Sequence, residues 1–263
     1  MIRSIVSPRL ETADRCRSDS VEFTLSRDVV LLVLKDGSAR LLDFNGSFYG
    51  LSATAAEMLQ QFLTVGREAA ARTVADSYST DVSRIEGDLD LLVRDLLRRG
   101  LLRKRGEASV GYAMGSNAAY LFTAPLLWIT RAVTNRSFRT RAWALLTIAN
   151  FSVTVFGWSK SITAWQHFFR SAIHTDEAPT DAVVYEIDAV TRDVGACHLL
   201  RIECKERALC CWAMLRMMGE AAELVVGVNL YPLASHCWCE VGSIVLTDFE
   251  DKCACYTPIL RYD

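Results

Sequence analysis

The stretch SHCWCEVGSIVLTDF, residues 235–249, places alternating side chains on either side of a Gly-Ser pair, a pattern typical of a β-hairpin. It carries His236 near one end and Asp248 near the other. A three-residue loop over 241–243 pairs position 236 with position 248 on one face, whereas a two-residue loop separates them. We expect the three-residue loop, since loops of this length that contain glycine are common. Asp248 could then orient the imidazole of His236.

A candidate nucleophile precedes this hairpin. The stretch RIECKERALCCWAMLRMMGE, residues 201–220, predicts a helix whose first turn contains Cys204. The helix dipole and the free backbone N–H groups at this point should lower the pKa of the thiol. Residues 222–228, AELVVGV, predict a buried strand between the helix and the hairpin. Cys204, His236 and Asp248 are therefore a candidate nucleophile, base and orienting group.

These segments resemble the transglutaminase-like cysteine protease of lasso-peptide biosynthesis. That family runs Cys-Leu-x-Arg-x-Leu, a Gly-Val strand end, His-Ala-Trp-Val-Glu and a later Asp, and this chain has CKERAL, VVGV, HCWCEV and TD in the same order. The resemblance implies a papain-like fold with Cys204, His236 and Asp248 as the catalytic triad. Lys205 departs from the pattern by replacing an apolar residue, and a cation beside the nucleophile could favour the thiolate.

Residues 21–105 show a different pattern, with strands first and three helices afterwards, which is typical of a small winged-helix-like α+β module. A hairpin turn is predicted at Asn45–Gly46. Ser52 or Thr54 can cap the first helix, and Gly100 stands where the third helix should end. The third helix is indicated by apolar residues at helical spacing, namely Ile85, Leu89, Leu92 and Leu96.

Residues 29–100 resemble the PqqD-like recognition element of pathways that make ribosomally synthesised and post-translationally modified peptides (RiPPs). The segments LLDFNGSFYGLSATAAEML and VSRIEGDLDLLVRDLLRRGLL carry this resemblance. Such elements bind a leader peptide as an added strand, beside their third strand and over their last helix. The resemblance assigns the pairing edge to Ser47, Phe48, Tyr49, Gly50 and Leu51, and the groove to Leu92, Asp95 and Leu96.

The two patterns divide the chain into a recognition domain over 1–105, a linker over 106–117 and a protease domain over 118–263. The linker segment is rich in glycine and serine after a charged start. A chain of 263 residues is long enough to bury two cores. We therefore predict an α+β protein, with a winged-helix-like PqqD domain followed by a transglutaminase-like domain.

Composition restricts the partners and the compartment. The formal net charge is −2 and no block of Lys or Arg dominates, which argues against nucleic acid as a partner. The N-terminus lacks the apolar core of a secretory signal and the nine cysteines are an odd number, so we expect reduced thiols in the cytoplasm. Residues 108–130 and 142–159 have no charged side chain, but polar residues dilute both segments. We expect core helices there, with peripheral contact at a membrane surface as the weaker alternative.

Some residues near the candidate triad fit simpler roles. Asp251 is a fallback orienting group for His236, although a carboxylate in a run of charges is typically a solvated surface group. The CWC and CAC pairs have one residue between their cysteines, whereas zinc sites more commonly have two to four. Cys237 and Cys239 also lie on the strand face opposite His236, where packing is the simpler role. We expect no metal and no cofactor.

The two resemblances together imply a leader peptidase of lasso-peptide maturation. The first domain would bind the leader of a precursor peptide, and Cys204 would attack the carbonyl at the leader–core junction, with backbone N–H groups as oxyanion donors. Acyl transfer by the same triad and a non-catalytic leader-binding adaptor are the alternatives. The resemblance also implies an ATP-using cyclase of asparagine-synthetase type as a partner. The Trp- and Phe-rich region 118–165 is the candidate contact surface.

Overall fold

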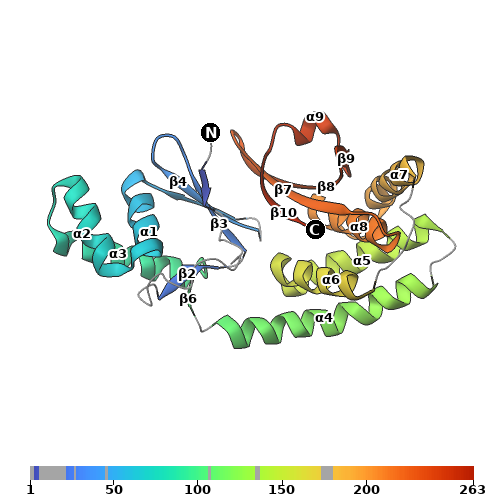
Figure 1. Ribbon diagram of the computed structural model, residues 1–263, viewed down its shortest axis with the longest axis horizontal. Helices are drawn as coiled ribbons and strands as arrows, with labels where there is room; N and C mark the ends of the chain where they lie inside the picture. Colours follow the sequence, from blue (N-terminus) through green and yellow to red (C-terminus); the bar gives the residue numbers. More distant parts are fainter. Residues whose placement is uncertain are drawn as a thin grey trace. The chain divides into compact units, whose positions relative to one another are not determined.

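The computed structural model describes residues 3–5, 22–26, 28–44, 47–105, 108–133, 137–172 and 180–263. The chain divides into two compact units, Met1–Ala113 and Met114–Asp263 (Figure 1). Each unit contains helices and strands, which confirms the predicted α+β class. The division falls within the segment predicted as a linker. Most of that segment is helical, because helix α4 begins at Ala108.

The first unit is built on an antiparallel sheet in the order β1-β3-β4-β5. Its strands are Arg3–Ile5, Val29–Val33, Ala39–Asp43 and Ser47–Leu51. A tight turn joins β3 to β4, in which Gly37 has a φ of 81° and Asp36 accepts hydrogen bonds from the N–H and hydroxyl of Ser38. Glycine adopts this left-handed conformation at no steric cost, which is why the KDG segment turns the chain here.

Strand β5 forms one edge of this sheet. The register of β4 and β5 pairs Asp43 with Ser47. The predicted turn at Asn45–Gly46 lies outside the described residues. In the described part of the chain no further strand follows β5 in this sheet, so β5 is an edge strand of the kind that can pair with an added peptide.

Three helices share one apolar core with the sheet. They are α1 Ala53–Val65, α2 Arg67–Tyr78 and α3 Val82–Arg98. Ser52 caps α1, because its hydroxyl accepts a hydrogen bond from the N–H of Ala55 at 3.2 Å. Gly100, with a φ of 72°, follows the end of α3 as predicted. Of the residues that indicated α3, Ile85, Leu89 and Leu96 are buried and Leu92 is half-buried.

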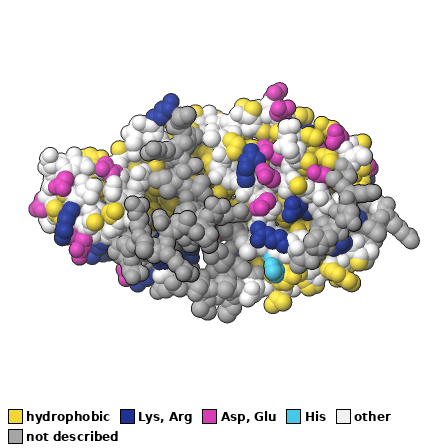
Figure 2. Space-filling view, viewed as in Figure 1, with side chains coloured by type: hydrophobic (Ala, Val, Ile, Leu, Met, Phe, Trp, Pro, Cys, Tyr) yellow, Lys and Arg dark blue, Asp and Glu magenta, His cyan; other side chains and the backbone are white. Residues whose placement is uncertain are grey.

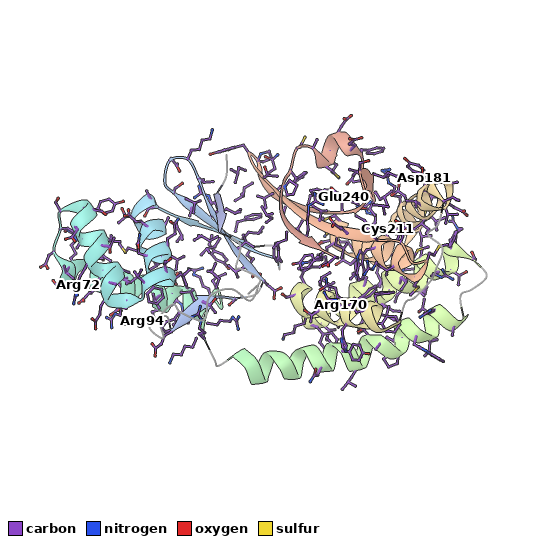
Figure 3. All side chains as sticks on the ribbon, viewed as in Figure 1. Arg72, Arg94, Arg170, Asp181, Cys211 and Glu240 are labelled. Carbon is purple, nitrogen blue, oxygen red and sulfur yellow. The ribbon has the colours of Figure 1, made fainter. Side chains whose placement is uncertain are left out.

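A small antiparallel pair, β2 (Phe23–Leu25) with β6 (Leu102–Lys104), completes the first unit. Basic side chains of the neighbouring helices lie on their exposed faces, as Arg72 of α2 and Arg94 of α3 show (Figure 3). Charged residues on the outer face of an amphipathic helix are the ordinary pattern for a surface helix.

The second unit is organised around one buried helix. Its long helices are most of α4 Ala108–Val133, α5 Phe138–Phe156, α6 Trp158–Ala172, α7 Asp181–Cys197 and α8 Cys204–Met217. The side chains of α8 are buried on every face between Ala208 and Leu215, as expected for a helix that is apolar all round. It packs against α5, α7 and the sheet strands β7 and β8. In the parts of the chain that the structure describes, no helix is long and apolar enough to cross a membrane.

The sheet of the second unit is antiparallel in the order β10-β7-β8-β9. Its strands are β7 Ala222–Leu230, β8 Leu233–Val241, β9 Ile244–Leu246 and β10 Thr257–Tyr262, and the short helix α9 Glu250–Cys253 precedes β10. The predicted alternation along β8 is confirmed. The rings of His236 and Trp238 stack on one face, and the thiol of Cys239 lies within hydrogen-bond reach of Cys211 on α8.

Candidate active site

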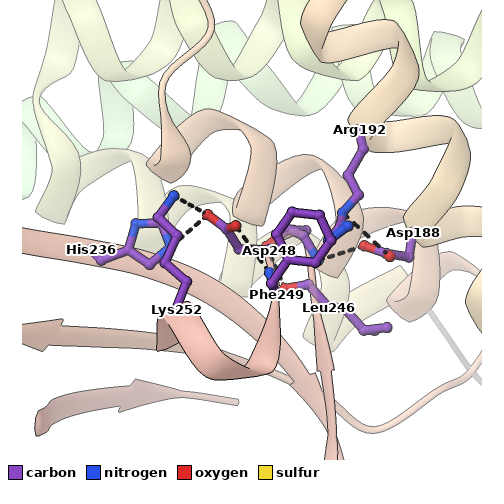
Figure 4. A network of polar contacts seen from close by, with 8 residues as sticks. Asp188, Arg192, His236, Leu246, Asp248, Phe249 and Lys252 are labelled. Carbon is purple, nitrogen blue, oxygen red and sulfur yellow. Dashed lines mark hydrogen bonds and ion pairs between the residues drawn. The ribbon is translucent and has the colours of Figure 1, made fainter. Parts of the chain in front are cut away.

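His236 and Asp248 lie in contact in the second unit. His236 stands on β8 and Asp248 between β9 and α9, and Nε2 is 3.0 Å from Oδ2 (Figure 4). Both are shielded from solvent, with side chains 5% and 10% exposed. The two atoms are close, but no hydrogen bond to Nε2 has good angular geometry. Because Asp248 faces Nε2, Nδ1 is the ring nitrogen left to exchange a proton.

The route by which Asp248 reaches the imidazole differs from the predicted one. Val241 pairs with Ile244, so the hairpin loop has two residues and the three-residue prediction is wrong. In this register a continued strand would carry Asp248 to the opposite face. The strand ends at Leu246 instead, and Thr247 adopts a φ of 73° that redirects the chain. The predicted pairing assumed a regular strand as far as Asp248, whereas the strand turns one residue before it.

Two aromatic rings pack against the imidazole of His236. The ring centroid of Trp238 lies 5.9 Å away and that of Tyr256 5.1 Å away. Gly227 faces His236 across the β7–β8 ladder and leaves space for these rings, since a Cβ there would lie 2.7 Å from the ring of Trp238. The indole N–H of Trp238 donates to Glu240 at 2.7 Å. Packing therefore helps to hold the imidazole in one orientation.

Cys204 is the first residue of α8, as predicted. A capping box fixes this helix end, and the N–H of Glu203 donates to the carboxylate of Glu206 at 2.9 Å. Cys204 as a residue is partly exposed, and its sulfur accepts a hydrogen bond from the backbone N–H of Cys237. It therefore lies beside the peptide bond that follows His236.

The thiol of Cys204 is not the activated thiolate that its place at a helix start predicts. Burial raises its pKa, and the hydrogen bond from Cys237 opposes that shift without reversing it. Glu206 raises the pKa further, and Arg207 lowers it. Lys205 forms an ion pair with the other glutamate of the capping box, at 3.6 Å. The net shift is therefore upward, opposite to the expected lowering, and a protonated thiol needs a base to become a nucleophile.

The pKa values of His236 and Asp248 are both lowered. Burial is the main cause for His236, with Lys252 and Arg207 adding to it, while the carboxylate of Asp248 opposes the shift. For Asp248, burial raises the pKa but is outweighed by hydrogen bonds from Nζ of Lys252 and the N–H of Phe249. A neutral imidazole beside an ionised carboxylate is suited to act as a general base.

Lys252 is a residue of this site that the sequence argument missed. Its Nζ lies 2.6 Å from Oδ2 of Asp248, the oxygen that also faces His236 (Figure 4). The four-residue spacing of Asp248 and Lys252 was the only sequence signal for this pair, and no helix had been predicted there. Asp251, the fallback orienting group, is exposed on α9. Within the described residues, no three His, Cys, Asp or Glu side chains form a group that could hold a metal ion.

The predicted leader-binding residues lie on β5 and α3 of the first unit. Arg99, just after α3, connects the two elements, because its guanidinium lies 5.3 Å from the ring centroid of Tyr49 and its Nε donates to Asp95 at 2.7 Å. Arg98 also donates to Asp95, at 2.6 Å. Tyr49 and Asp95 are thus linked through an arginine that the sequence argument did not single out.

The other predicted groove residues differ in their exposure. Leu51 and Leu96 are 8% and 3% exposed and belong to the core, so they support the surface without facing solvent. Leu92 is half-buried, and Ser47 and Gly50 on β5 are exposed. A peptide that adds to β5 would therefore meet Leu92 more directly than Leu96.

Two family models match the chain. Residues 28–102 match the model described as Coenzyme PQQ synthesis protein D (PqqD), and residues 152–261 match the model described as Transglutaminase-like superfamily. The chain contains a PqqD domain and a transglutaminase-like domain. The comparisons found no match among curated proteins and none among solved structures.

Each domain contains the residues predicted for it. The PqqD domain, a precursor-peptide-binding element in RiPP pathways, includes β5 and α3. The transglutaminase-like domain includes Cys204, His236 and Asp248, and its superfamily is typically cysteine-protease-like or acyltransferase in chemistry. Helix α4 and the first part of α5 lie outside both matches.

Proposed function

We propose that the protein is a cytoplasmic leader peptidase of lasso-peptide maturation, which hydrolyses the bond between the leader and the core of a precursor peptide. One observation carries the proposal: the sulfur of Cys204 lies beside the peptide bond that follows His236, and His236 lies 3.0 Å from Asp248. A thiol, a neutral imidazole and a carboxylate are the groups needed for acyl transfer through a thioester. The PqqD domain supports a peptide substrate from a RiPP pathway.

In the proposed first half-reaction, Nδ1 of His236 takes the thiol proton of Cys204 as the sulfur attacks the carbonyl carbon at the leader–core junction. Backbone N–H groups at the start of α8 stabilise the oxyanion. The imidazolium, stabilised by Asp248, gives its proton to the nitrogen of the core, and the carbon–nitrogen bond breaks. The core leaves with a new amino terminus, and the leader remains on Cys204 as a thioester.

The second half-reaction releases the leader. His236, again neutral, takes a proton from a water molecule that attacks the thioester carbonyl. The carbon–sulfur bond breaks, the proton returns to the sulfur of Cys204, and the leader leaves with a free carboxylate. Burial lowers the pKa of His236, so the neutral imidazole is favoured again once the ring has given up its proton. The ring is then ready to act as a base in the next step.

Leader binding is assigned in this proposal to a winged-helix-like recognition domain over 1–105, with a papain-like protease domain over 118–263. An extended leader would pair with the outer edge of β5 and lie over α3, next to Tyr49 and Asp95. Binding the leader at one domain raises the effective concentration of the scissile bond at Cys204. The proposal therefore assigns substrate choice to the PqqD domain and chemistry to the second.

An exposed apolar surface on α4 and α5 is the proposed contact for a cyclase of asparagine-synthetase type. Phe122 of α4 stacks with Phe151 of α5 at 6.1 Å, which joins the two helices at this surface. Hydrophobic side chains reach the surface of the second unit (yellow in Figure 2), and those exposed on these helices include Leu121, Trp128, Ile129 and Val155. Large exposed apolar patches commonly mark interaction sites.

Co-purification with the cyclase tests this contact. Trp128→Asp should abolish capture of the cyclase by the tagged protein, because a charge at the centre of an apolar interface is strongly unfavourable. Tyr185→Asp, at an exposed position on α7, is the matched control and should leave capture unchanged. Equal capture by both variants would remove this surface from the proposal.

Acyl transfer is the second candidate, because the transglutaminase-like superfamily includes acyltransferase chemistry. The thioester would then pass to an amine instead of water. Mass spectrometry of the products separates the two, since hydrolysis yields a leader with a free carboxylate and transfer yields an amide adduct. A non-catalytic leader-binding adaptor is the remaining alternative, in which no leader is released.

The test of the proposed function is cleavage of a full-length precursor by the full-length protein. The wild type should release the leader, and Cys204→Ala and His236→Ala should each slow release by about 10³-fold or more. Cys197→Ala, at an exposed cysteine at the end of α7, is the matched control and should cleave normally. Release at an unchanged rate by Cys204→Ala would overturn the proposal.

A further inference from the structure

Asp248 follows a residue whose backbone conformation is unfavourable for its side chain. Thr247 has a φ of 73°, a region in which a β-branched residue is rare, and it is 2% exposed. Its hydroxyl donates to the carbonyl of Leu246, the preceding residue, and so does not tie the turn to another element. A threonine keeps such a conformation only where the surrounding structure enforces it.

Two side chains of α7 supply that support. Oδ1 of Asp188 accepts a hydrogen bond from the N–H of Thr247 at 2.5 Å. Arg192, one turn later on the same helix, has its Nε 3.5 Å from Asp188, and its guanidinium lies 4.5 Å from the ring centroid of Phe249 (Figure 4). The residues immediately before and after Asp248 are thus both held by α7.

The charges around Asp188 indicate that it positions the backbone of the turn and does not attract Asp248 electrostatically. Its side chain is 17% exposed, and burial raises its pKa while Thr247, Arg192 and Arg207 lower it. Asp248 faces it as a like charge, so the two carboxylates repel. Asp188 therefore contributes to the site through the backbone N–H that it accepts and not by attracting Asp248.

We infer that Asp188 is a positioning residue of the active site: it holds the turn at Thr247 so that the carboxylate of Asp248 faces His236. Arg192 assists from the other side by covering Phe249. The inference rests on the proposed function only in that the His236–Asp248 contact is taken to serve cleavage. The hydrogen bond between Asp188 and Thr247 stands independently of any substrate.

Three variants on α7 separate geometry from charge. Asp188→Ala removes the acceptor, and cleavage of the precursor should slow by about 10- to 100-fold in kcat with KM unchanged, because Asp248 is released from His236. Asp188→Asn keeps an oxygen that can accept from Thr247 and should restore the rate to within a few-fold of wild type. Asp193→Ala, on the same helix with an exposed ion pair to Arg139 at 3.4 Å, is the matched control and should cleave normally.

A second substitution tests the turn itself. Thr247→Gly in the Asp188→Ala background should recover part of the lost rate, because glycine adopts a positive φ without a side-chain penalty. If Asp188→Ala alone does not fold, recovery of a folded and active protein by the double variant supports the same conclusion. Failure of both Asp188→Asn and the double variant to recover activity would overturn the inference.

A measurement on the protein without substrate tests this inference independently of the proposed function. In the folded Asp188→Ala variant, an NMR titration should show a lower pKa for His236 than in the wild type, because the Asp248 carboxylate that raises it has moved away. Lys252 and Arg207, which also face the ring, are unchanged in every variant. An unchanged titration of His236 would overturn the positioning role, whether or not any precursor is cleaved.

Discussion

At the scale of single residues, one nitrogen of His236 faces the carboxylate of Asp248, and two aromatic rings pack against the imidazole. Its pKa lies below the ordinary value of 6.5 because of burial. The folded state therefore binds fewer protons than the unfolded state near that pH. This contributes stability that is present above the unfolded pKa and is lost as the pH falls through the folded pKa. The proposed cleavage needs the same neutral ring. The acid limb of its pH–rate profile should therefore lie below pH 6.5.

Lys252→Met should move that acid limb to higher pH. The ammonium group lowers the pKa of His236, so its removal lets the ring hold a proton at higher pH. The measurement is kcat/KM for precursor cleavage between about pH 4 and 8. Lys160→Met on α6, in the same unit, is the control and should leave the limb in place. A shift to lower pH, or none, would contradict the assigned role of Lys252.

Gly227→Ala should destabilise the protein and slow cleavage. The new Cβ would lie 2.7 Å from the ring of Trp238 and 2.9 Å from Cβ of Tyr256, so the rings that hold His236 must move. We expect the free energy of unfolding in denaturant to fall by about 1–3 kcal/mol. Gly87→Ala on α3 is the matched control, because its Cβ meets no atom within 4 Å. A variant at Gly227 as stable and active as the control would show that this close packing does not matter.

At the scale of elements, the sequence predicted correctly those helix ends and strand faces that depend only on residues a few positions apart. The Ser52 cap, the Gly100 helix end and the alternation along β8 are patterns within a few residues, and each is present in the structure. The turn at Thr247 has no such signal. It is held by Asp188, 59 positions earlier in the chain, and a contact at that separation leaves no local pattern.

The acidity of Cys204 was mispredicted for a related reason. The helix start is visible in the sequence, and it argues for a lowered pKa. The burial that raises the pKa depends on how α8 packs against the sheet, which the sequence does not show. The helix position was therefore correct while the electrostatic consequence drawn from it was wrong.

Tyr49→Ala should weaken binding of the leader peptide by about tenfold or more, the loss expected for an aromatic anchor at a peptide-binding edge. Tyr49 stands on the edge strand β5 and contacts Arg99 near the end of α3, where the leader is proposed to lie. Fluorescence anisotropy of a labelled leader peptide measures the affinity. Tyr78→Ala, at an exposed tyrosine that ends α2, is the control, and equal affinities for the two variants would argue against β5 as the binding edge.

At the scale of the whole molecule, the chain combines a PqqD domain and a transglutaminase-like domain in one polypeptide. The two domains were predictable because each carries its own ordered set of motifs, and a separate family model matches each of them. Helix α4 and the first part of α5, which lie outside both matches, were predictable only as apolar helices. Its role depends on a partner, and composition alone does not identify one.

Truncating the leader of the precursor should raise KM by about 100-fold while kcat changes little. Tethering contributes effective concentration, not transition-state stabilisation, so its loss appears in KM. The measurement is steady-state cleavage of full-length and leader-truncated precursors by the full-length protein. A loss confined to kcat would mean that the leader acts on the catalytic domain itself and would contradict simple tethering.

Detection of the covalent intermediate is the sharpest test of the proposed function. The protein is mixed with precursor, quenched in acid within the first turnover, and digested for mass spectrometry. The account predicts the leader attached through its terminal carbonyl to Cys204, as a thioester that hydroxylamine removes. Release of the leader with no acyl group on Cys204, at a rate that Cys204→Ala leaves unchanged, would contradict it.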